Sequence, residues 1–205
     1  MTGRLRRAII LIVAVISLSA FQKAVAQSNL LPDSLQGWFL VAAPDMPDPR
    51  FAGTVIYMIR HGPDGAMGFV INRVLAEDWA GNILDPGSAP AERSGRKIAV
   101  HYGGPVGATE GFILHSDDFS GGNSVKVAEG VWLSADAEIL REMARGEGPA
   151  RGLFVLGYSG WAPGQLESEL ARDDWVIAPG DTGLLFDPDL ANKWRRAWDN
   201  RGVRL

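Results

Sequence analysis

The segment Thr54–Asn72, TVIYMIRHGPDGAMGFVIN, decides the fold class of this 205-residue chain. Two runs rich in β-branched and aromatic residues, Thr54–Ile59 and Ala66–Ile71, flank the short polar stretch His61–Gly65. Within that stretch, Asp64-Gly65 is a dipeptide that readily supplies the positive φ angles of a tight turn. The segment therefore predicts a β-hairpin, whose two strands are antiparallel.

Further runs of the same kind, bounded by glycine, predict additional strands of one sheet system. The clearer ones are Trp38–Ala43, Ile98–Tyr102, Phe112–His115 and Leu153–Tyr158, and the weaker ones are Val125–Val127, Val131–Leu133, Trp175–Ile177 and Leu184–Phe186. The segment Leu75–Arg96 lacks firm periodicity, and it predicts a surface loop with one helical turn near Ala76–Ala80.

Three helices are predicted among these strands. The first follows Ser134, a good N-cap, and ends at Gly146. The second begins at Pro163, and the third begins with Asp187 as its N-cap and ends at Gly202. Because the helices do not alternate regularly with the strands, the pattern favours an α+β fold with a mixed, largely antiparallel sheet.

The N-terminal segment differs from the rest of the chain. Arginines at positions 4, 6 and 7 precede the apolar stretch Ala8–Phe21, which is followed by Ala24-Val25-Ala26. This order is typical of a secretory signal peptide over residues 1–26, with one domain in residues 27–205. The apolar stretch is shorter than the roughly 18 to 20 residues of a membrane span, so we expect no permanent span. A signal anchor and a misassigned start codon are the alternatives.

Charge and cysteine content restrict the possible partners and sites. Residues 1–26 hold four of the 20 basic residues and none of the 24 acidic ones, so the remainder has a net charge of −8. Such a surface repels nucleic acid, except through a local cluster of basic residues. The C-terminal cluster is either such a patch or a solvated helix face and tail; it contains Lys193, Arg195, Arg196, Arg201 and Arg204. With no cysteine in the chain, disulfides and zinc-thiolate sites are excluded.

The stretch Gly157–Trp161, GYSGW, is similar to a nucleophile elbow but has tryptophan in place of its last glycine. Ser159 is therefore predicted to be a turn residue, with a Ser/His hydrolase using His61, His101 or His115 as a minor alternative. The histidine spacings match no metal motif, and a calcium site at loop carboxylates is a further alternative. We predict no metal and no other cofactor.

Several segments together resemble the YqgE/AlgH family of bacterial proteins. They include Gly37–Ala42 (GWFLVA), Gly65–Arg73 (GAMGFVINR), Gly103–Val106 (GGPV) and Phe112–His115 (FILH), and the resemblance extends over roughly Leu35–Gly202. It implies a sheet curled into a partial barrel and no established catalytic activity. The family name also implies an association with transcriptional regulation in alginate production. This chain departs from the family pattern at Val74, where proline is usual, and in its N-terminal leader.

The resemblance also indicates candidate site residues. Its shared positions are Asn72, Gly103, Gly104, His115, Trp161, Gln165, Glu169 and Trp175. One hypothesis is that Asn72, His115 and Gln165 converge in a polar ligand-binding pocket walled by Trp161. Alternatively His115 binds the backbone, and Gln165 forms half of a capping box. Five glycines are predicted to serve turns or close backbone packing: Gly65, Gly68, Gly103, Gly104 and Gly160.

Two principal functions remain open from the sequence. The first is a non-catalytic module, periplasmic or secreted, that binds an unknown protein or small ligand. The second is a cytoplasmic transcriptional regulator, which requires the leader to be an artefact and the C-terminal arginines to face DNA. Export would make a nucleic-acid partner physically implausible.

Overall fold

The computed structural model describes residues 32–79, 83 and 97–202. The chain divides into two compact units, Met1–Ser34 and Leu35–Leu205, and the second unit contains every helix and strand described below. The predicted signal peptide, residues 1–26, lies outside the described residues, as do most of the predicted loop Leu75–Arg96 and Arg204.

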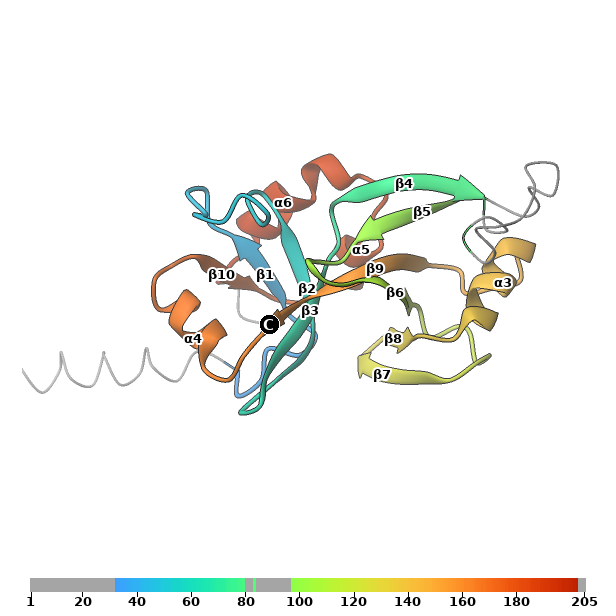
Figure 1. The fold of residues 1–205 in the computed structure, drawn as a ribbon, viewed down its shortest axis with the longest axis horizontal. Helices are drawn as coiled ribbons and strands as arrows, with labels where there is room; N and C mark the ends of the chain where they lie inside the picture. The colour runs from blue at the N-terminus through green and yellow to red at the C-terminus, as the bar shows by residue number, and fades with distance from the viewer. Residues whose placement is uncertain (1–31, 80–82, 84–96, 203–205) are drawn as a thin grey trace, which may run out of the picture. The chain divides into compact units, whose positions relative to one another are not determined.

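Ten strands form one sheet (Figure 1). They are β1 (Phe39–Ala42), β2 (Val55–Gly62), β3 (Gly65–Val70), β4 (Val74–Trp79), β5 (Lys97–Tyr102), β6 (Val106–His115), β7 (Ser124–Ala128), β8 (Val131–Ser134), β9 (Gly152–Trp161) and β10 (Trp175–Ala178). Their order is β10-β1-β2-β3-β9-β6-β8-β7, and β5 pairs with both β4 and β9.

The sheet is curled into a half-barrel, as the family resemblance implied. The long strand β9 connects its two halves, because its C-terminal part pairs with β3 and its N-terminal part pairs with β5 and β6. Among the described strands, every pairing is antiparallel except that of β5 with β9. The predicted mixed, largely antiparallel α+β fold is therefore confirmed.

The hairpin of β2 and β3 is also confirmed. Gly62 pairs with Gly65, which leaves Pro63 and Asp64 as the two turn residues. Gly65 has the positive φ that the turn requires, 113°, whereas Asp64 has a negative φ. A register shift between Met58 and Arg60 marks a β-bulge in β2, a feature that bends the strand locally.

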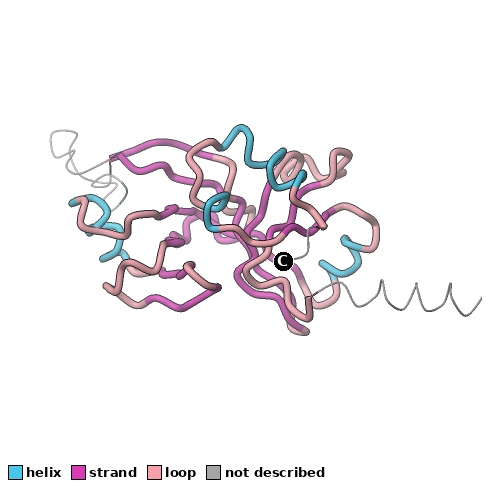
Figure 2. Tube along the Cα trace, turned by 180° about the vertical axis from the view of Figure 1, so that it is seen from behind, coloured by secondary structure: helices cyan, strands magenta, loops and turns pink. Residues whose placement is uncertain are grey.

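Four helices are present among the described residues, rather than the three predicted (Figure 2). They are α3 (Ala137–Arg145), α4 (Gln165–Leu170), α5 (Thr182–Leu185) and α6 (Leu190–Asp199). The extra helix is α5, which replaces the predicted strand Leu184–Phe186. Asp181 caps this helix by accepting a hydrogen bond from the Gly183 N–H. The strand was predicted from the apolar run Leu184–Phe186 alone, which does not include this capping residue.

Other predicted elements and boundaries need correction. The helix α4 begins at Gln165 rather than at Pro163, and α6 ends at Asp199 rather than at Gly202. Residues 74–79 form β4 rather than a loop with a helical turn, because β5 supplies backbone partners along its length, for example Ala76 opposite Val100. The helices α3 and α6 are capped by Asp136 and Asp189, each two residues beyond the predicted N-cap. Ser134 instead ends β8, and its hydroxyl donates to the Asn123 carbonyl.

The strand β1 is buried on both faces, so alternate side chains enter different parts of the core. Phe39 and Val41 pack in a cluster with residues of α5 and α6, and Leu40 packs in a second cluster with Leu166 of α4. A third cluster joins α3 to β5, β6 and β9. In both views α3 and α4 lie at opposite ends of the sheet (Figures 1 and 2).

Candidate functional site

A cavity of about 570 Å³, hereafter the central cavity, lies between α3 and the strands β4, β5, β6 and β9. Its volume falls within the range of about 300–1,000 Å³ that is typical of small-molecule sites. The larger apolar side chains of its wall are Ile83, Val100, Ile113, Leu140, Phe154 and Leu156. Among the described residues that line it, the polar side chains are Asp78, Thr109 and Asp136.

The cavity owes its space to a bulge and to small residues. On β6, Val106 and Gly111 are paired with Tyr158 and Leu156 of β9, so four residues of β6 stand opposite a single residue of β9. Such an excess of residues on one strand bends that strand away from its partner. Small residues then line the space that opens: Ala76, Ala108, Gly111, Ala135 and Ala137.

Asp136 places a negative charge at the wall of the central cavity. Its carboxylate accepts hydrogen bonds from the backbone N–H groups of Glu138 and Asn123, at 2.9 and 3.3 Å. Both bonds lower the pKa of Asp136, and the bond from the Glu138 N–H lowers it more than the bond from the Asn123 N–H does. The carboxylate is therefore ionised at neutral pH while it caps α3.

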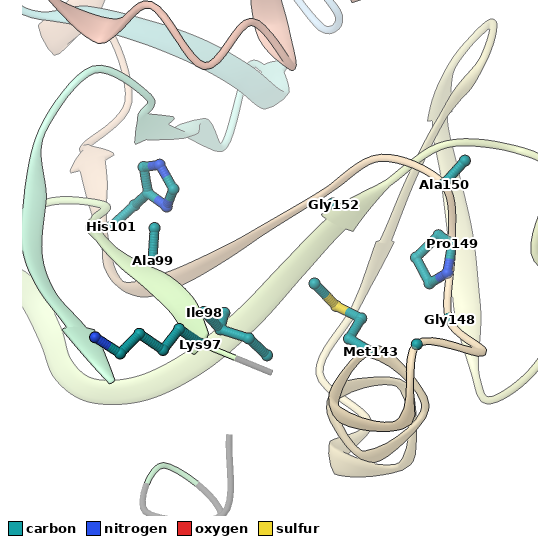
Figure 3. A pocket seen from close by; sticks show the side chains of 10 residues that line it. Lys97, Ile98, Ala99, His101, Met143, Gly148, Pro149, Ala150 and Gly152 are labelled. Carbon is teal, nitrogen blue, oxygen red and sulfur yellow. The ribbon is translucent and has the colours of Figure 1, made fainter. Parts of the chain in front are cut away.

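A second cavity, of about 290 Å³, lies on the other face of β5 (Figure 3). Ala99 and His101 of β5 line one side, and Met143 of α3 and the loop around Pro149 line the other. His101 is 4% exposed, its Nδ1 donates to the Phe154 carbonyl, and burial lowers its pKa. A neutral, bonded histidine in a smaller space makes this cavity the weaker candidate for a ligand site.

Asn72 and His115, two of the predicted pocket residues, are each engaged locally. Asn72 accepts a hydrogen bond from the Val55 N–H and donates to the Gly53 carbonyl, both at 2.9 Å. His115 is fully buried, and its Nδ1 donates to the Ser116 carbonyl.

Trp161 and Gln165 are brought together through Glu169. The indole N–H groups of Trp161 and Trp175 donate to the same Glu169 oxygen, Oε2, at 2.8 and 2.9 Å. The Gln165 side chain donates to Glu169 Oε1 and accepts from the Ala162 N–H, so it folds back onto the backbone ahead of α4. Because Gly164 is the N-cap and Gln165 the first helical residue, this is not the capping box considered above. This arrangement ties the end of β9 to α4 and to β10.

The predicted convergence of Asn72, His115 and Gln165 beside Trp161 is wrong. His115 lies opposite Gly152, which is the first residue of β9, whereas Trp161 is the last residue of β9. Ten strand residues span roughly 30 Å, so the two side chains lie far apart. None of the four residues is among those that line the two cavities.

Ser159 does not present a reactive hydroxyl. It is fully buried, and its Oγ donates to the Gly103 carbonyl at 3.1 Å. Here the chain passes close to its neighbour: a Cβ on Gly103 would lie 2.2 Å from the Gly157 oxygen, and one on Gly104 would lie 2.2 Å from the Tyr158 carbonyl carbon. The stretch GYSGW is thus part of β9 where it crosses the segment after β5, and the prediction of Ser159 as a turn residue is wrong.

The other glycines predicted to be structural also lie at close approaches. A Cβ on Gly65 would lie 2.3 Å from the Trp161 carbonyl oxygen, and one on Gly68 would lie 2.6 Å from the Ile56 side chain. At Gly160 the nearest atom, in the Tyr158 ring, would be 3.2 Å away, a tight contact with a side chain rather than with the backbone.

Three of the five C-terminal basic residues make contacts within the fold, whereas Arg195 is exposed and donates only to the Asn192 side chain, and Arg204 lies outside the described residues. Lys193 is fully buried rather than on a solvated face, and its Nζ donates to the Leu185 carbonyl. Arg196 forms an ion pair with Asp187, and the Arg201 guanidinium lies 4.3 Å from the Trp198 ring centroid. Lys193 lies one turn before Ala197 on the buried face of α6, and this spacing is the sequence signal of its burial.

The described residues contain no cluster of three or more histidine and acidic side chains that could hold a metal ion. In the same ranges, no helix combines the length and the apolar character needed to cross a bilayer.

The chain was compared with known proteins. A family model described as AlgH-like matches residues 39–205. The chain is similar to a UPF0301 protein of Methylococcus capsulatus, with 42% identity over 82% of this chain and 92% of the relative. A UPF0301 protein of Cereibacter sphaeroides shares 41% identity over the same fractions.

Two solved structures have the same fold. The AlgH protein of Pseudomonas aeruginosa has a TM-score of 0.70 and 35% identity, over 85% of this chain and 92% of that one. A Corynebacterium diphtheriae protein has a TM-score of 0.60 over 80% and 84% of the two chains, and at 22% identity it shows the fold alone. The family model and the relatives establish that this chain belongs to the AlgH-like family.

Proposed function

We propose that this protein is a non-catalytic binding module that takes a small, largely apolar ligand in the central cavity. The observation that carries the proposal is a ligand-sized cavity whose larger side chains are aliphatic or aromatic. The ionised Asp136 and the side chain of Asp78 favour a ligand whose polar end is neutral or cationic.

We further propose that the protein acts outside the cytoplasm. The support is the sequence: a basic start, the apolar stretch Ala8–Phe21 and the small residues at 24–26. The engaged state of Lys193 and Arg196 leaves the alternative role in transcription with less support, because a DNA-facing patch needs available cationic side chains. Recovery of the native protein from periplasmic extract with Gln27 as its first residue is the expected result. Recovery from the cytosol with Met1 retained would refute export.

Ligand binding is tested by filling the central cavity. Ala137 lies at the start of α3, lines the cavity and is exposed, so Ala137→Trp adds bulk there without disturbing the buried core. Ala171→Trp is the matched control, since Ala171 is exposed beside α4 and is not among the cavity-lining residues. Nile red, a neutral apolar dye, serves as the probe.

We expect saturable Nile red fluorescence at one equivalent in the parent protein and in Ala171→Trp. Binding should weaken at least roughly tenfold in Ala137→Trp, which corresponds to a loss of about 1.4 kcal/mol. Unsaturable binding, or equal affinity in the three proteins, would defeat the proposal for this cavity.

A further inference from the structure

His115 and Ser124 form a hydrogen-bonded pair whose direction is fixed by a third group. His115 Nδ1 lies 2.8 Å from the Ser116 carbonyl oxygen, which can only accept, so Nδ1 carries the proton. In the neutral ring, Nε2 is therefore an acceptor, and it lies 2.9 Å from Ser124 Oγ. The serine hydroxyl consequently donates to a basic nitrogen, which is the arrangement of an activated nucleophile.

The sheet holds this pair in position. His115 ends β6 and Ser124 begins β7, and β8 lies between these strands and pairs with both. On β8, Trp132 is opposite His115 and Ser134 is opposite Ser124. The ring of Phe119 also packs edge-on against the imidazole, with a centroid separation of 6.1 Å. Because regular structure fixes both backbones, the bond does not depend on a loop conformation.

Ser124 differs in two respects from Ser159, the serine that the sequence singles out. Ser159 is fully buried and donates to a carbonyl oxygen, which cannot take up a proton. Ser124 is partly exposed and donates to an imidazole, which can. The combination of access and a basic partner is what a reacting hydroxyl requires.

We propose that Ser124 is an acyl-acceptor site that reacts with activated acyl donors such as thioesters or aryl esters. Ser124 Oγ forms a bond to the acyl carbon while its proton passes to His115 Nε2. The bond between the acyl carbon and the leaving group then breaks, and the proton is released to the departing anion or to solvent. The products are one O-acyl-serine and either the protonated leaving group or its anion plus one proton in solvent, and no oxidant or reductant is needed.

The burial of His115 determines the donor class. A fully buried ring accepts the proton of Ser124 but is not exposed to protonate a bulky, poor leaving group such as a peptide amine. Donors whose leaving group departs as a stable anion need no such protonation. The reaction is a stoichiometric modification, independent of a ligand in the central cavity, and it is compatible with a non-catalytic binding module.

The first test uses p-nitrophenyl acetate as the donor. We expect a gain in intact mass of one acetyl group, mapped to Ser124 by peptide analysis, with release of one equivalent of p-nitrophenolate. Acylation at position 124 should be absent in Ser124→Ala, which has no hydroxyl, and His115→Gln should slow it roughly a hundredfold or more, the usual contribution of a positioned base. Ser120→Ala is the matched control, because Ser120 is an exposed serine in the preceding loop. Equal labelling of Ser120 and Ser124 would overturn the proposal.

The second test does not depend on the stability of a variant that loses the hydrogen bond. The chain has no cysteine, so Ser124→Cys and Ser120→Cys each introduce a single thiol. If His115 activates position 124, that thiol reacts with iodoacetamide at pH 7 at least roughly tenfold faster than the thiol at position 120, although it is less exposed. A slower reaction at position 124, in a variant that retains the parent's circular dichroism spectrum, would show that the His115–Ser124 bond is structural.

Discussion

The Lys193 Nζ lies 2.6 Å from the carbonyl oxygen of Leu185, the last residue of α5, and the lysine is fully buried. The cation thus meets the negative end of a short helix and satisfies one of its unpaired carbonyls. Burial removes the ammonium group from water, and this desolvation lowers the pKa of Lys193 from 10.5 to about 8. The charge of Asp187 raises the pKa, and the charge of Arg196 lowers it further.

This relationship predicts a specific pH dependence of stability. Between about pH 8 and 10.5 the unfolded chain retains the Lys193 proton while the folded chain releases it, so the unfolded state binds more protons. Raising the pH through this window therefore stabilises the fold. Urea unfolding of the parent and of Lys193→Met, at intervals from pH 7.0 to 9.5, should show the parent gaining stability relative to the variant. Comparison with Lys193→Met cancels the contribution of Tyr57, whose pKa burial raises to about 12. A constant difference between the two proteins would contradict the prediction.

Glu169 is predicted to be essential for the junction of β9, α4 and β10. Trp161 and Trp175 are 7% and 3% exposed, so replacing their shared acceptor in Glu169→Ala leaves two indole N–H groups without a partner. We expect the free energy of unfolding to fall by about 2 kcal/mol or more, measured in urea. The control is Glu167→Ala, which removes the single hydrogen bond that His61 Nε2 donates to this half-exposed carboxylate and should cost about 1 kcal/mol or less. Equal losses in the two variants would argue against the shared-acceptor role.

Gly103 is predicted to tolerate no side chain. In Gly103→Ala the new methyl group would lie 2.2 Å from the Gly157 oxygen and 2.4 Å from a Val155 methyl carbon, so β9 must move. We expect a loss of about 3 kcal/mol or more in the free energy of unfolding. Gly62→Ala is the matched control, since a Cβ there meets nothing within 4 Å. Thermal unfolding monitored by circular dichroism distinguishes the two, and a Gly103→Ala protein as stable as Gly62→Ala would refute the close packing.

Asp136 is predicted to stabilise the start of α3 through its charge. The backbone N–H groups of Glu138 and Asn123 lower its pKa from 3.8, so the folded state holds the carboxylate more firmly ionised than the unfolded state does. Its contribution is present above the unfolded pKa and is lost as the pH falls through the folded pKa. The melting temperature of Asp136→Asn should therefore lie below that of the parent at pH 7, and the gap should narrow as the pH drops below about 4. A gap that stays constant down to pH 3 would exclude the carboxylate charge as the cause.

The β2–β3 hairpin illustrates what could be read from local sequence. Its two strands pair as expected, and Pro63 and Asp64 form the turn between Gly62 and Gly65, all within one continuous stretch of sequence. The cores of α3 and α6 were likewise predicted, although their N-caps were placed two residues early because several acceptable caps stand in a row.

The errors arose where a distant partner decides the structure. β4 contains Glu77 and Asp78, residues disfavoured in strands, and it forms because β5 pairs with it. The predicted pocket of Asn72, His115, Trp161 and Gln165 was wrong for a related reason. A resemblance to a family indicates which residues are shared, but it does not indicate at which end of a strand each residue lies. The central cavity had no sequence signature, since it results from a register shift between β6 and β9.

The sequence by itself determined the α+β class, the hairpin, the absence of thiol chemistry and the family resemblance, because each rests on local patterns or on composition. The tertiary structure decided contacts that residue spacing does not reveal: Lys193 against Leu185, eight positions apart across a helix boundary, and His115 against Ser124, nine positions apart across β8. The physical reason is that hydrogen-bond partners and burial depend on strand order and register, which the pairing of the whole sheet fixes at once.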